Sequence, residues 1–246
     1  MQKTKARILS TAILSQSLID MGRENGMIID TISFTDIRPS VNEETEKKIA
    51  EFSSKKMTAV FTSAHAAETL INKLQSKKPD WKIYCTAGNT KKTVSKYFGE
   101  GLIAGAGANA VSIADKIVAD HIKEVLFFCG NLRRDEIPSS LANHGIKVHE
   151  VAVYNTILTP QPVDNNYNGI LFFSPSAVES YFSANKPEKE VVLFAIGDTT
   201  AGSIKKFSQN KIVISESPEK EGLSKLAIRY FQNHPVHYPT HDQFKK

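Results

Sequence analysis

Five short loops of small polar residues have the composition of anion-binding sites. Serine and threonine hydroxyls and free backbone N–H groups donate hydrogen bonds, and a following helix adds the positive end of its dipole. The same residue types are preferred as helix N-caps, so capping alone explains any single loop. Repetition of the pattern favours a shared anionic ligand. The candidate binding residues are Thr62, Ser63, Ala64, Gly88, Thr90, Gly130, Ser174, Ser176, Gly197 and Thr199.

Further side chains carry chemistry of their own. Arg133 and Arg134 follow Gly130 and are either ordinary surface arginines or contacts for ligand carboxylates. Tyr154 ends a predicted strand, so its ring packs structurally or its hydroxyl donates to a ligand. His65 lies early in a predicted helix, where a surface or capping role is commoner than that of a general base.

No pattern for a metal or a cofactor is found in the sequence. Cys85 and Cys129 stand far apart inside predicted strands, without paired-ligand spacing, which predicts two reduced core thiols. The segment 105–110 fits the G-x-G-x-x-A dinucleotide fingerprint, but its strand is short and is not the first of its domain. The next strand ends at Cys129-Gly130, without an acidic residue to hold a ribose. We therefore expect no cofactor and no metal.

Length, composition and charge narrow the class of protein. The 246 residues suffice for one large or two ordinary domains, and 41% apolar with 23% charged residues indicates a globular chain. The net charge of +5 is spread out, which argues against a nucleic-acid partner and suits an acidic small molecule. No apolar run approaches a membrane span, and the first residues lack a signal-peptide core. We expect a cytoplasmic monomer without a membrane partner.

The C-terminal histidines do not form a metal-binding pattern. His234, His237 and His241 lie among prolines and lysines at spacings that fix no ligand geometry. We therefore interpret the chain after about residue 232 as a disordered tail.

Short apolar runs alternate with amphipathic stretches along the chain, which predicts an α/β fold with mainly parallel sheets. One unit has a strand at 7–10, a helix at about 15–24 and a strand at 27–34. A similar unit has a strand at 125–128, a helix at 135–143 and a strand at 146–154. In both units a glycine, Gly26 or Gly145, closes the helix, because glycine adopts the left-handed conformation most easily.

The remaining units also occur in pairs. Residues 60–68 resemble 171–179, residues 83–90 resemble 193–200, and helices are predicted at 111–119 and near 223–231. An offset of roughly 110–118 residues indicates an internal duplication. The polar segments 35–56 and 155–168 fit no unit and are interpreted as connections between two domains. The residues alone leave open whether the domains are tandem halves or a permuted pair.

The predicted strands explain how the polar loops could act together. In parallel α/β sheets, ligands bind beyond the carboxyl ends of the strands, where loops lead into helices. Each of the five loops follows a predicted strand. We therefore expect them to bind an anionic ligand in a cleft between the two domains.

Several short motifs occur along the chain in a fixed order and spacing. They are Phe61-Thr62-Ser63, Gly130 with Leu141 and Gly145, Tyr154, the segments 173–178 and 195–201, and Ser217-Pro218 before the final helix. Each motif is weak alone, but the set is specific, and it resembles the uroporphyrinogen-III synthase family from about residue 5 to 232.

The resemblance implies two flavodoxin-like domains with parallel sheets flanked by helices, joined by a two-stranded linker. It implies the permuted arrangement, with domain one at 1–35 and 157–246 and an inserted domain two at 37–155. It also implies that hydroxymethylbilane, which carries eight carboxylates, loses water and closes to a ring whose fourth pyrrole, ring D, is inverted. Tyr154 corresponds to the family's tyrosine proposed as hydrogen-bond donor to the departing hydroxyl, and the ten loop residues above to substrate contacts.

Two positions depart from the family pattern. Thr11-Ala12-Ile13 stands where many members have Thr-Arg-Pro, so an arginine contact is missing or is supplied elsewhere. Asp198 replaces a frequent proline, and a carboxylate beside an anionic substrate must point away or cap its helix. The alternatives are a non-catalytic two-lobed binding module for an acidic small molecule, and a sugar-phosphate isomerase, for which no acid–base pair is evident.

Overall fold

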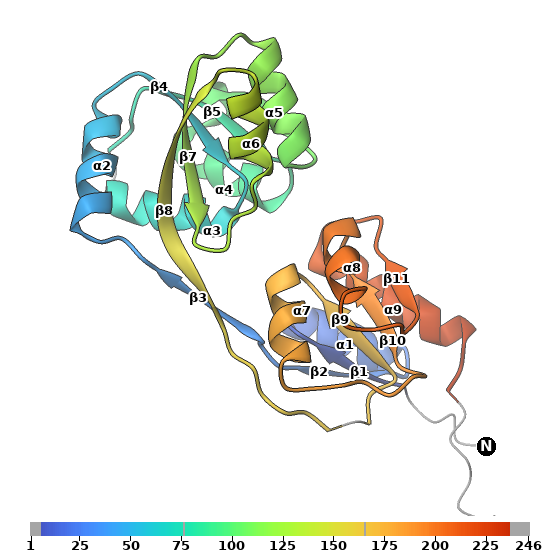
Figure 1. Ribbon diagram of the computed structural model, residues 1–246. Helices are drawn as coiled ribbons and strands as arrows, with labels where there is room; N and C mark the ends of the chain where they lie inside the picture. Colours follow the sequence, from blue (N-terminus) through green and yellow to red (C-terminus); the bar gives the residue numbers. More distant parts are fainter. Residues whose placement is uncertain (1–5, 76, 165, 237–246) are drawn as a thin grey trace, which may run out of the picture. The chain divides into compact units, whose positions relative to one another are not determined.

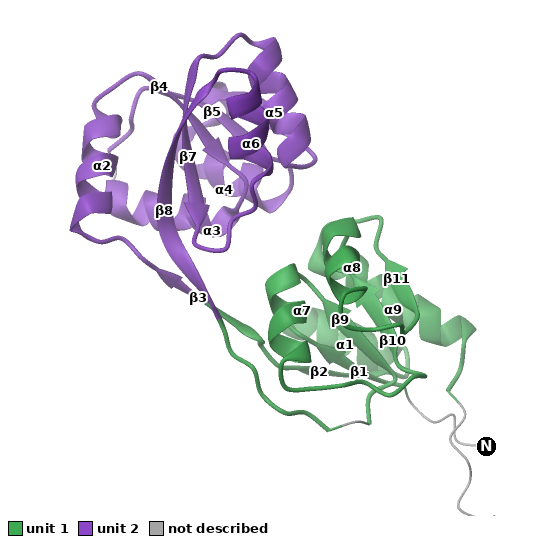
Figure 2. Cartoon of the chain, viewed as in Figure 1, with its two compact units in different colours: residues 1–36, 158–246 green, residues 37–157 purple. Residues whose placement is uncertain are grey.

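The chain folds into two compact units, and the computed structural model describes residues 6–75, 77–164 and 166–236 (Figure 1). Unit 1 comprises residues 1–36 and 158–246, and unit 2 comprises residues 37–157 (Figure 2). The chain crosses between the units inside two strands, β3 (Thr35–Pro39) and β8 (Lys147–Leu158).

Unit 1 is a five-stranded sheet in the order β11-β10-β9-β1-β2, with every neighbouring pair parallel. Counted along the unit, this is the 2-1-3-4-5 order of flavodoxin-like folds. The strands are β1 (Arg7–Ser10), β2 (Ile28–Thr31), β9 (Gly169–Phe172), β10 (Val192–Ala195) and β11 (Ile212–Ile214). The helices are α1 (Gln16–Glu24), α7 (Pro175–Phe182), α8 (Asp198–Ile204) and α9 (Lys220–Asn233).

Unit 2 is a six-stranded sheet in the order β3-β8-β7-β4-β5-β6. The strands from β8 to β6 are parallel. The edge strand β3 is antiparallel to β8, since Ser40 N donates to Val153 O and Thr159 N to Phe34 O. The remaining strands are β4 (Met57–Phe61), β5 (Trp81–Thr86), β6 (Ile103–Gly107) and β7 (Glu124–Gly130). The helices are α2 (Glu43–Ser53), α3 (Ala64–Leu74), α4 (Asn89–Phe98), the 3-10 turn η1 (Glu100–Leu102), α5 (Ala110–Ala119) and α6 (Glu136–Asn143).

Each parallel sheet is buried on both faces, which explains why its strands are continuous apolar runs rather than alternating ones. Successive residues point to opposite faces, so Ile8 packs under α1 and α9, whereas Leu9 packs under α7 and α8. In unit 2, Phe61 packs beneath α3 and α4, and Val60 beneath α5 and α6. The predicted α/β class with parallel sheets flanked by helices is confirmed.

The duplicated units occupy equivalent places in the two sheets. β1 and β2 of unit 1 correspond to β7 and β8 of unit 2, and β9, β10 and β11 correspond to β4, β5 and β6. β1 pairs with β9, and β7 pairs with β4, so each sheet combines strands from both sequence copies. This pairing of strands is that of a permuted pair rather than of two tandem halves.

The predicted glycine closures are confirmed at both helix ends. Gly26 has φ +75° and Gly145 has φ +69°, values that a residue with a Cβ atom adopts only with strain. Each glycine follows a helix end and leads into the next strand, which fixes the turn of the repeated unit.

Several predicted boundaries were wrong. The strand expected over 27–34 ends at Thr31, and Phe34 is buried beside Tyr181 instead. The connection expected over 35–56 contains β3 and α2, and the one expected over 155–168 begins inside β8. By contrast, α9 ends at Asn233, which agrees with a tail beginning after about residue 232, and residues 237–246 of that tail lie outside the described residues.

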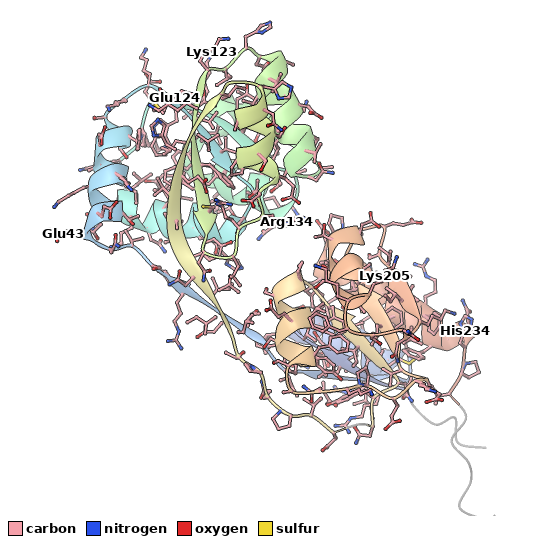
Figure 3. The ribbon with its side chains drawn as sticks, viewed as in Figure 1. Glu43, Lys123, Glu124, Arg134, Lys205 and His234 are labelled. Atoms are coloured by element: carbon pink, nitrogen blue, oxygen red, sulfur yellow. The ribbon has the colours of Figure 1, made fainter. Side chains whose placement is uncertain are left out.

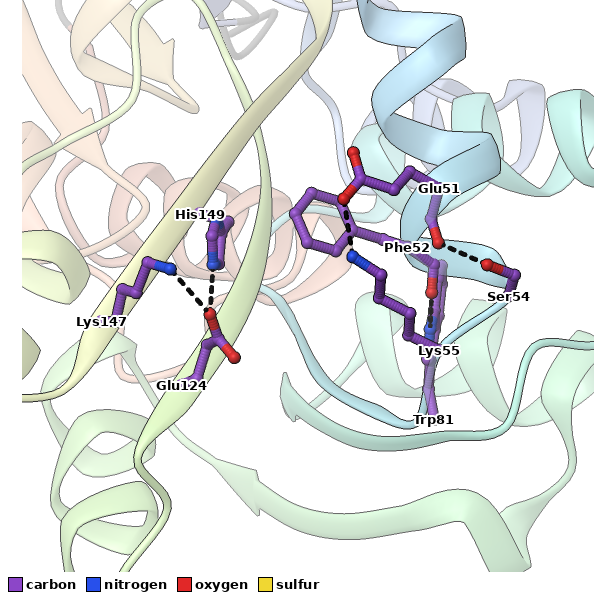
Figure 4. Close-up of polar contacts among 8 residues, drawn as sticks. All are labelled: Glu51, Phe52, Ser54, Lys55, Trp81, Glu124, Lys147 and His149. Atoms are coloured by element: carbon purple, nitrogen blue, oxygen red, sulfur yellow. Dashed lines mark hydrogen bonds and ion pairs between the residues drawn. The ribbon is translucent and has the colours of Figure 1, made fainter.

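Helix α2 is fixed to the sheet through its last turn. Trp81 Nε1 at the start of β5 donates to Phe52 O at 3.1 Å, and the Phe52 ring lies 4.8 Å from that of His149 (Figure 4). His149 Nε2 lies 2.5 Å from Glu124 Oε1, and Lys147 Nζ lies 3.1 Å from the same oxygen (Figure 4). These contacts gather at the amino ends of the strands.

Within the described residues, no helix combines the length and apolar character needed to cross a bilayer.

Candidate functional site

A pocket of about 280 Å³ opens at the carboxyl ends of the unit 2 strands. It lies beside the ends of β4 and β7, which are neighbours in the sheet. β5 follows β4 on one side and β8 follows β7 on the other, so the strand order reverses here, where α/β sheets bind ligands. The lining residues are Thr62, Ser63, Thr86, Ala108, Asn109, Ala110, Phe127, Cys129, Gly130, Leu132, Arg133, Arg134, Glu136, Ile137 and Tyr154.

Tyr154 is held at the pocket by its neighbours on β7 and α3. Its hydroxyl donates to Ser63 Oγ at 3.2 Å. Ser63 is the N-cap residue of α3, and its side chain makes no capping hydrogen bond to that helix. A Cβ at Gly130 would lie 2.5 Å from the Tyr154 ring, so only glycine leaves room for the ring there. The predicted Thr62, Ser63, Gly130 and Tyr154 thus line one pocket, although they come from three different strands and loops.

Burial keeps the Tyr154 phenol in its protonated form. Its pKa is raised from the ordinary value chiefly by burial, while the hydrogen bond with Ser63 opposes the shift. The ring also contacts His65 edge-on, with centroids 6.0 Å apart. The group is therefore a proton and hydrogen-bond donor at neutral pH, which is the form that assists a leaving hydroxyl.

Arginines and carboxylates share the rim of the pocket. Arg133 pairs with Asp135 through Nη1 and with Glu150 through Nε. Arg134 Nη1 lies 3.0 Å from Glu136 Oε1, and Figure 3 shows Arg134 at the edge of unit 2 opposite Lys123 and Glu124. These pairs orient both guanidinium groups at the pocket, and the several N–H donors of a guanidinium suit a carboxylate.

Three predicted binding residues of unit 2 do not line this pocket. Ala64 is the first residue of α3, Gly88 precedes α4, and Thr90 is buried within α4. They lie at the same carboxyl edge of the sheet, since Gly88 and Thr90 follow β5 and Ala64 follows β4. Their backbone N–H groups belong to helix N-termini, the part of a helix that attracts anions.

The predicted binding residues of unit 1 follow β9 and β10. Ser174 caps α7 by accepting from Ala177 N at 3.1 Å, and its hydroxyl lies 2.9 Å from that of Ser176. Gly197 and Thr199 lie at the start of α8, where Thr199 is exposed. Asp198 is the first residue of that helix and is also exposed, a place that favours an acid.

Several residues that line the pocket are not identified by sequence reasoning. Thr86 ends β5, and Asn109 forms a capping box with Ser112 at the start of α5. α5 begins at Ala110, one residue before the helix predicted at 111–119, and the N-x-x-S pattern at 109–112 could have indicated the Asn109 cap. Leu132 is exposed and lacks any motif, so only its position identifies it.

The cysteines are buried and unpaired, as predicted. Cys85 lies in β5 and Cys129 in β7, and burial raises the pKa of each thiol to about 11. Both thiols therefore stay protonated and unreactive near neutral pH, although Cys129 lines the pocket. Within the described part of the chain, no three His, Cys, Asp or Glu side chains gather as a metal-ligand set.

Two flavodoxin-like sheets, with hydrogen-bond donors in the loops at the carboxyl ends of their strands, define an α/β protein of two units. A family model described as uroporphyrinogen-III synthase HemD matches residues 16–225. The chain belongs to the uroporphyrinogen-III synthase family, and it is an enzyme of heme biosynthesis with a small-molecule substrate.

Solved structures share this fold. A mutant uroporphyrinogen III synthase from the extremely thermophilic bacterium Thermus thermophilus gives a TM-score of 0.69 at 11% identity, covering 93% of this chain and 99% of that one. Uroporphyrinogen-III synthetase from Helicobacter pylori gives 0.63 at 16% identity, covering 92% and 99%. At such identities the likeness shows the fold alone. No curated protein matches the chain.

Proposed function

We propose that the protein is a hydro-lyase that closes hydroxymethylbilane to uroporphyrinogen III, acting as a cytoplasmic monomer. The observation that carries the proposal is the protonated Tyr154 phenol in the switch-point pocket, bonded to Ser63 and packed against a glycine. The two buried free thiols suit a reducing compartment. Units 1 and 2 are proposed as the two domains of the enzyme.

In the proposed reaction, Tyr154 donates a proton to the hydroxyl of the substrate. The carbon–oxygen bond breaks, water leaves, and the positive charge spreads over the adjacent pyrrole to give an azafulvene-type cation. The substituted carbon of ring D attacks this cation and forms a spiro intermediate. The bond from that carbon to the methylene bridge of ring C then breaks, the methylene bonds to the free α-carbon of ring D, and the proton lost from that carbon restores the phenol. One water is lost overall, and no further reactant is required.

Substrate carboxylates are proposed to bind the donor-rich strand ends of the two sheets. In unit 2 these donors are Thr62, Ser63, Ala64, Gly88, Thr90 and Gly130, and in unit 1 they are Ser174, Ser176, Gly197 and Thr199. Fixing several carboxylates at once restricts the linear substrate to the conformation in which ring D presents its substituted carbon.

The isomer formed from hydroxymethylbilane tests this proposal better than the rate does. The bilane closes unaided through the free end of ring D, which gives the symmetric type I product. Purified protein is expected to yield mainly type III, faster than the blank yields type I, because only a bound conformation redirects the attack. Chromatographic separation of the oxidised isomers measures the ratio.

The isomer ratio also separates the alternatives. Tight binding of the bilane with only type I product would identify a non-catalytic binding module. Neither binding nor conversion would show that this chain lacks the activity of its family.

A further inference from the structure

The ammonium of Lys220 lies at the switch point of unit 1. There β1 and β9 are neighbours, with β2 and β10 following on opposite sides. Lys220 Nζ donates to Ile13 O in the loop after β1 at 2.8 Å, and lies 5.9 Å from the centre of the Phe173 ring after β9. One side chain thus reaches the loops that follow both central strands. The equivalent position in unit 2, at β7 and β4, is the pocket of Tyr154.

The N-terminus of α9 is an electrostatically unfavourable place for the Lys220 ammonium unless a negatively charged group lies beside it. Lys220 is the first residue of α9, where the helix dipole is positive and a lysine costs stability. Within the described residues, no carboxylate lies at ion-pair distance from its ammonium, and nearby Glu221 pairs with Lys225 at 2.6 Å. Lys220 is an exposed residue, but partial desolvation of its ammonium still lowers its pKa, as expected without a counter-charge.

Two kinds of hydrogen-bond donor, the Lys220 ammonium and the serine hydroxyls after Phe173, are available to a ligand in this part of unit 1. The Ile13 carbonyl uses one of the three ammonium N–H groups, so two remain. Phe173 precedes Ser174, whose hydroxyl lies 2.9 Å from that of Ser176. One of the two serine hydroxyls donates to the other, so an incoming carboxylate would find the Lys220 ammonium and one free hydroxyl donor, and it would relieve the repulsion between Lys220 and the helix dipole.

We propose that Lys220 binds a carboxylate of the substrate at the unit 1 switch point. This inference rests on the proposed function and names the unit 1 cation that contacts the substrate. It assigns to α9 the contact that the loop residues Thr11-Ala12-Ile13 cannot supply, because none of their side chains is cationic. Ile13 contributes only its carbonyl, which holds the ammonium in place.

Binding of uroporphyrin, a stable tetrapyrrole with eight carboxylates, tests the assignment without depending on turnover. Lys220→Met keeps most of the apolar stem and removes the charge, and is expected to weaken binding about tenfold, or about 1.4 kcal/mol. Lys220→Arg should restore affinity to within about threefold of wild type, because it retains the charge. Lys225→Met, on the same helix, is the matched control and should change affinity less than about twofold.

Two further readouts separate carboxylate binding from a structural role. Raising the ionic strength should weaken uroporphyrin binding more in wild type than in Lys220→Met, because one charge pair is already lost in the variant. With hydroxymethylbilane, Lys220→Met should raise KM about tenfold while kcat changes little, as expected for a contact made equally in the bound substrate and the transition state.

The outcomes distinguish this inference from the proposed function. If wild type and Lys220→Met bind uroporphyrin equally tightly, the assignment of Lys220 is wrong, but the proposed function still stands. A loss in Lys220→Met that Lys220→Arg does not restore, with unchanged salt dependence, shows that Lys220 merely holds the Ile13 loop. Wild-type protein that neither binds uroporphyrin nor converts the bilane overturns the assignment and the proposed function together.

Discussion

Tyr154, Ser63 and Gly130 depend on one another more than on the rest of the pocket. Gly130 lies close against the Tyr154 ring, and Ser63 fixes the hydroxyl without using its own oxygen to cap α3. Ser63 Oγ accepts a hydrogen bond from the Tyr154 phenol instead, and this bond offsets the stability lost by leaving the N-terminus of α3 without a side-chain cap. The arrangement orients the Tyr154 phenol as a hydrogen-bond donor at the pocket.

Replacing Tyr154 by Phe should lower turnover by roughly 10–100-fold, the low end of general-acid effects. The ring stays in place, so uroporphyrin binding and the melting temperature should change little. Steady-state kinetics with hydroxymethylbilane measures the effect. Tyr97→Phe is the matched control, because the Tyr97 hydroxyl is bonded to Lys77 O in the same unit, away from the pocket. Equal turnover in the two variants would reduce Tyr154 to a packing residue.

The pH profile supplies an independent readout for the same residue. Because burial raises the Tyr154 pKa, the phenol keeps its proton above the pH at which an exposed tyrosine, with a pKa of about 10, would lose it. Ionisation of Tyr154 should therefore cause no fall in activity between about pH 7 and 9. An alkaline fall in wild type that disappears in Tyr154→Phe would mean that the pKa is lowered instead.

At this scale the sequence predicts residue types better than residue partners. Thr62, Ser63, Gly130 and Tyr154 are identified separately, from loop composition and resemblance, and the structure brings them to one pocket. The closeness of Gly130 to the tyrosine ring is not predictable, because it depends on the register in which Gly130 pairs with Tyr154 across β7 and β8. Such long-range register leaves no local signal.

Among the secondary-structure elements, α2 shows where sequence reasoning fails. Its eleven residues are mostly charged or polar, with only Ile49 and Phe52 buried, so the segment has the composition of a connection. The helix is stabilised instead by tertiary contacts, namely the Trp81–Phe52 hydrogen bond and the packing of Phe52 on His149. By contrast, the central strands are predicted well because burial on both faces requires continuous apolar runs.

Phe52→Ala should therefore destabilise unit 2 by about 3 kcal/mol, the loss expected for a large side chain removed from a core. Turnover of the folded variant at low temperature should stay within about twofold of wild type, because no residue of α2 lines the Tyr154 pocket. Denaturant unfolding and steady-state kinetics measure the two effects.

A surface substitution on the same helix is the control for Phe52→Ala. Lys48→Ala breaks an exposed pair with Glu44 and should cost less than about 0.5 kcal/mol. If Phe52→Ala and Lys48→Ala unfold at the same denaturant concentration, α2 is not part of the cooperative unit and our account of its attachment is wrong.

For the whole molecule, the duplication and the permuted topology have a folding consequence. Unit 2 is one continuous segment whose sheet, helices and core come from residues 37–157. Unit 1 is interrupted, and its inner strand β1 lies between β9 and β2 although all of unit 2 separates β1 from β9 along the chain. The two units therefore differ in what each needs in order to fold.

Residues 37–157 expressed alone should fold cooperatively, whereas residues 158–246 alone should not. The first segment keeps every strand of its sheet apart from the ends of β3 and β8, and the second lacks β1 and β2, which exposes β9 as an edge. Circular dichroism and thermal melting of the two fragments measure the difference.

Joining residues 1–36 to residues 158–246 through a short glycine-serine linker should restore the fold of unit 1. The ends to be joined are already close, since Thr159 N donates to Phe34 O at 3.1 Å, so the linker adds little loop-closure entropy. The joined fragment should melt cooperatively, and the unlinked fragment 158–246 is its control. Cooperative melting of 158–246 without 1–36 would contradict the role of β1 as an inner strand that unit 1 needs in order to fold.

If the fragment 37–157 does not fold alone, unit 2 depends on unit 1 for its stability.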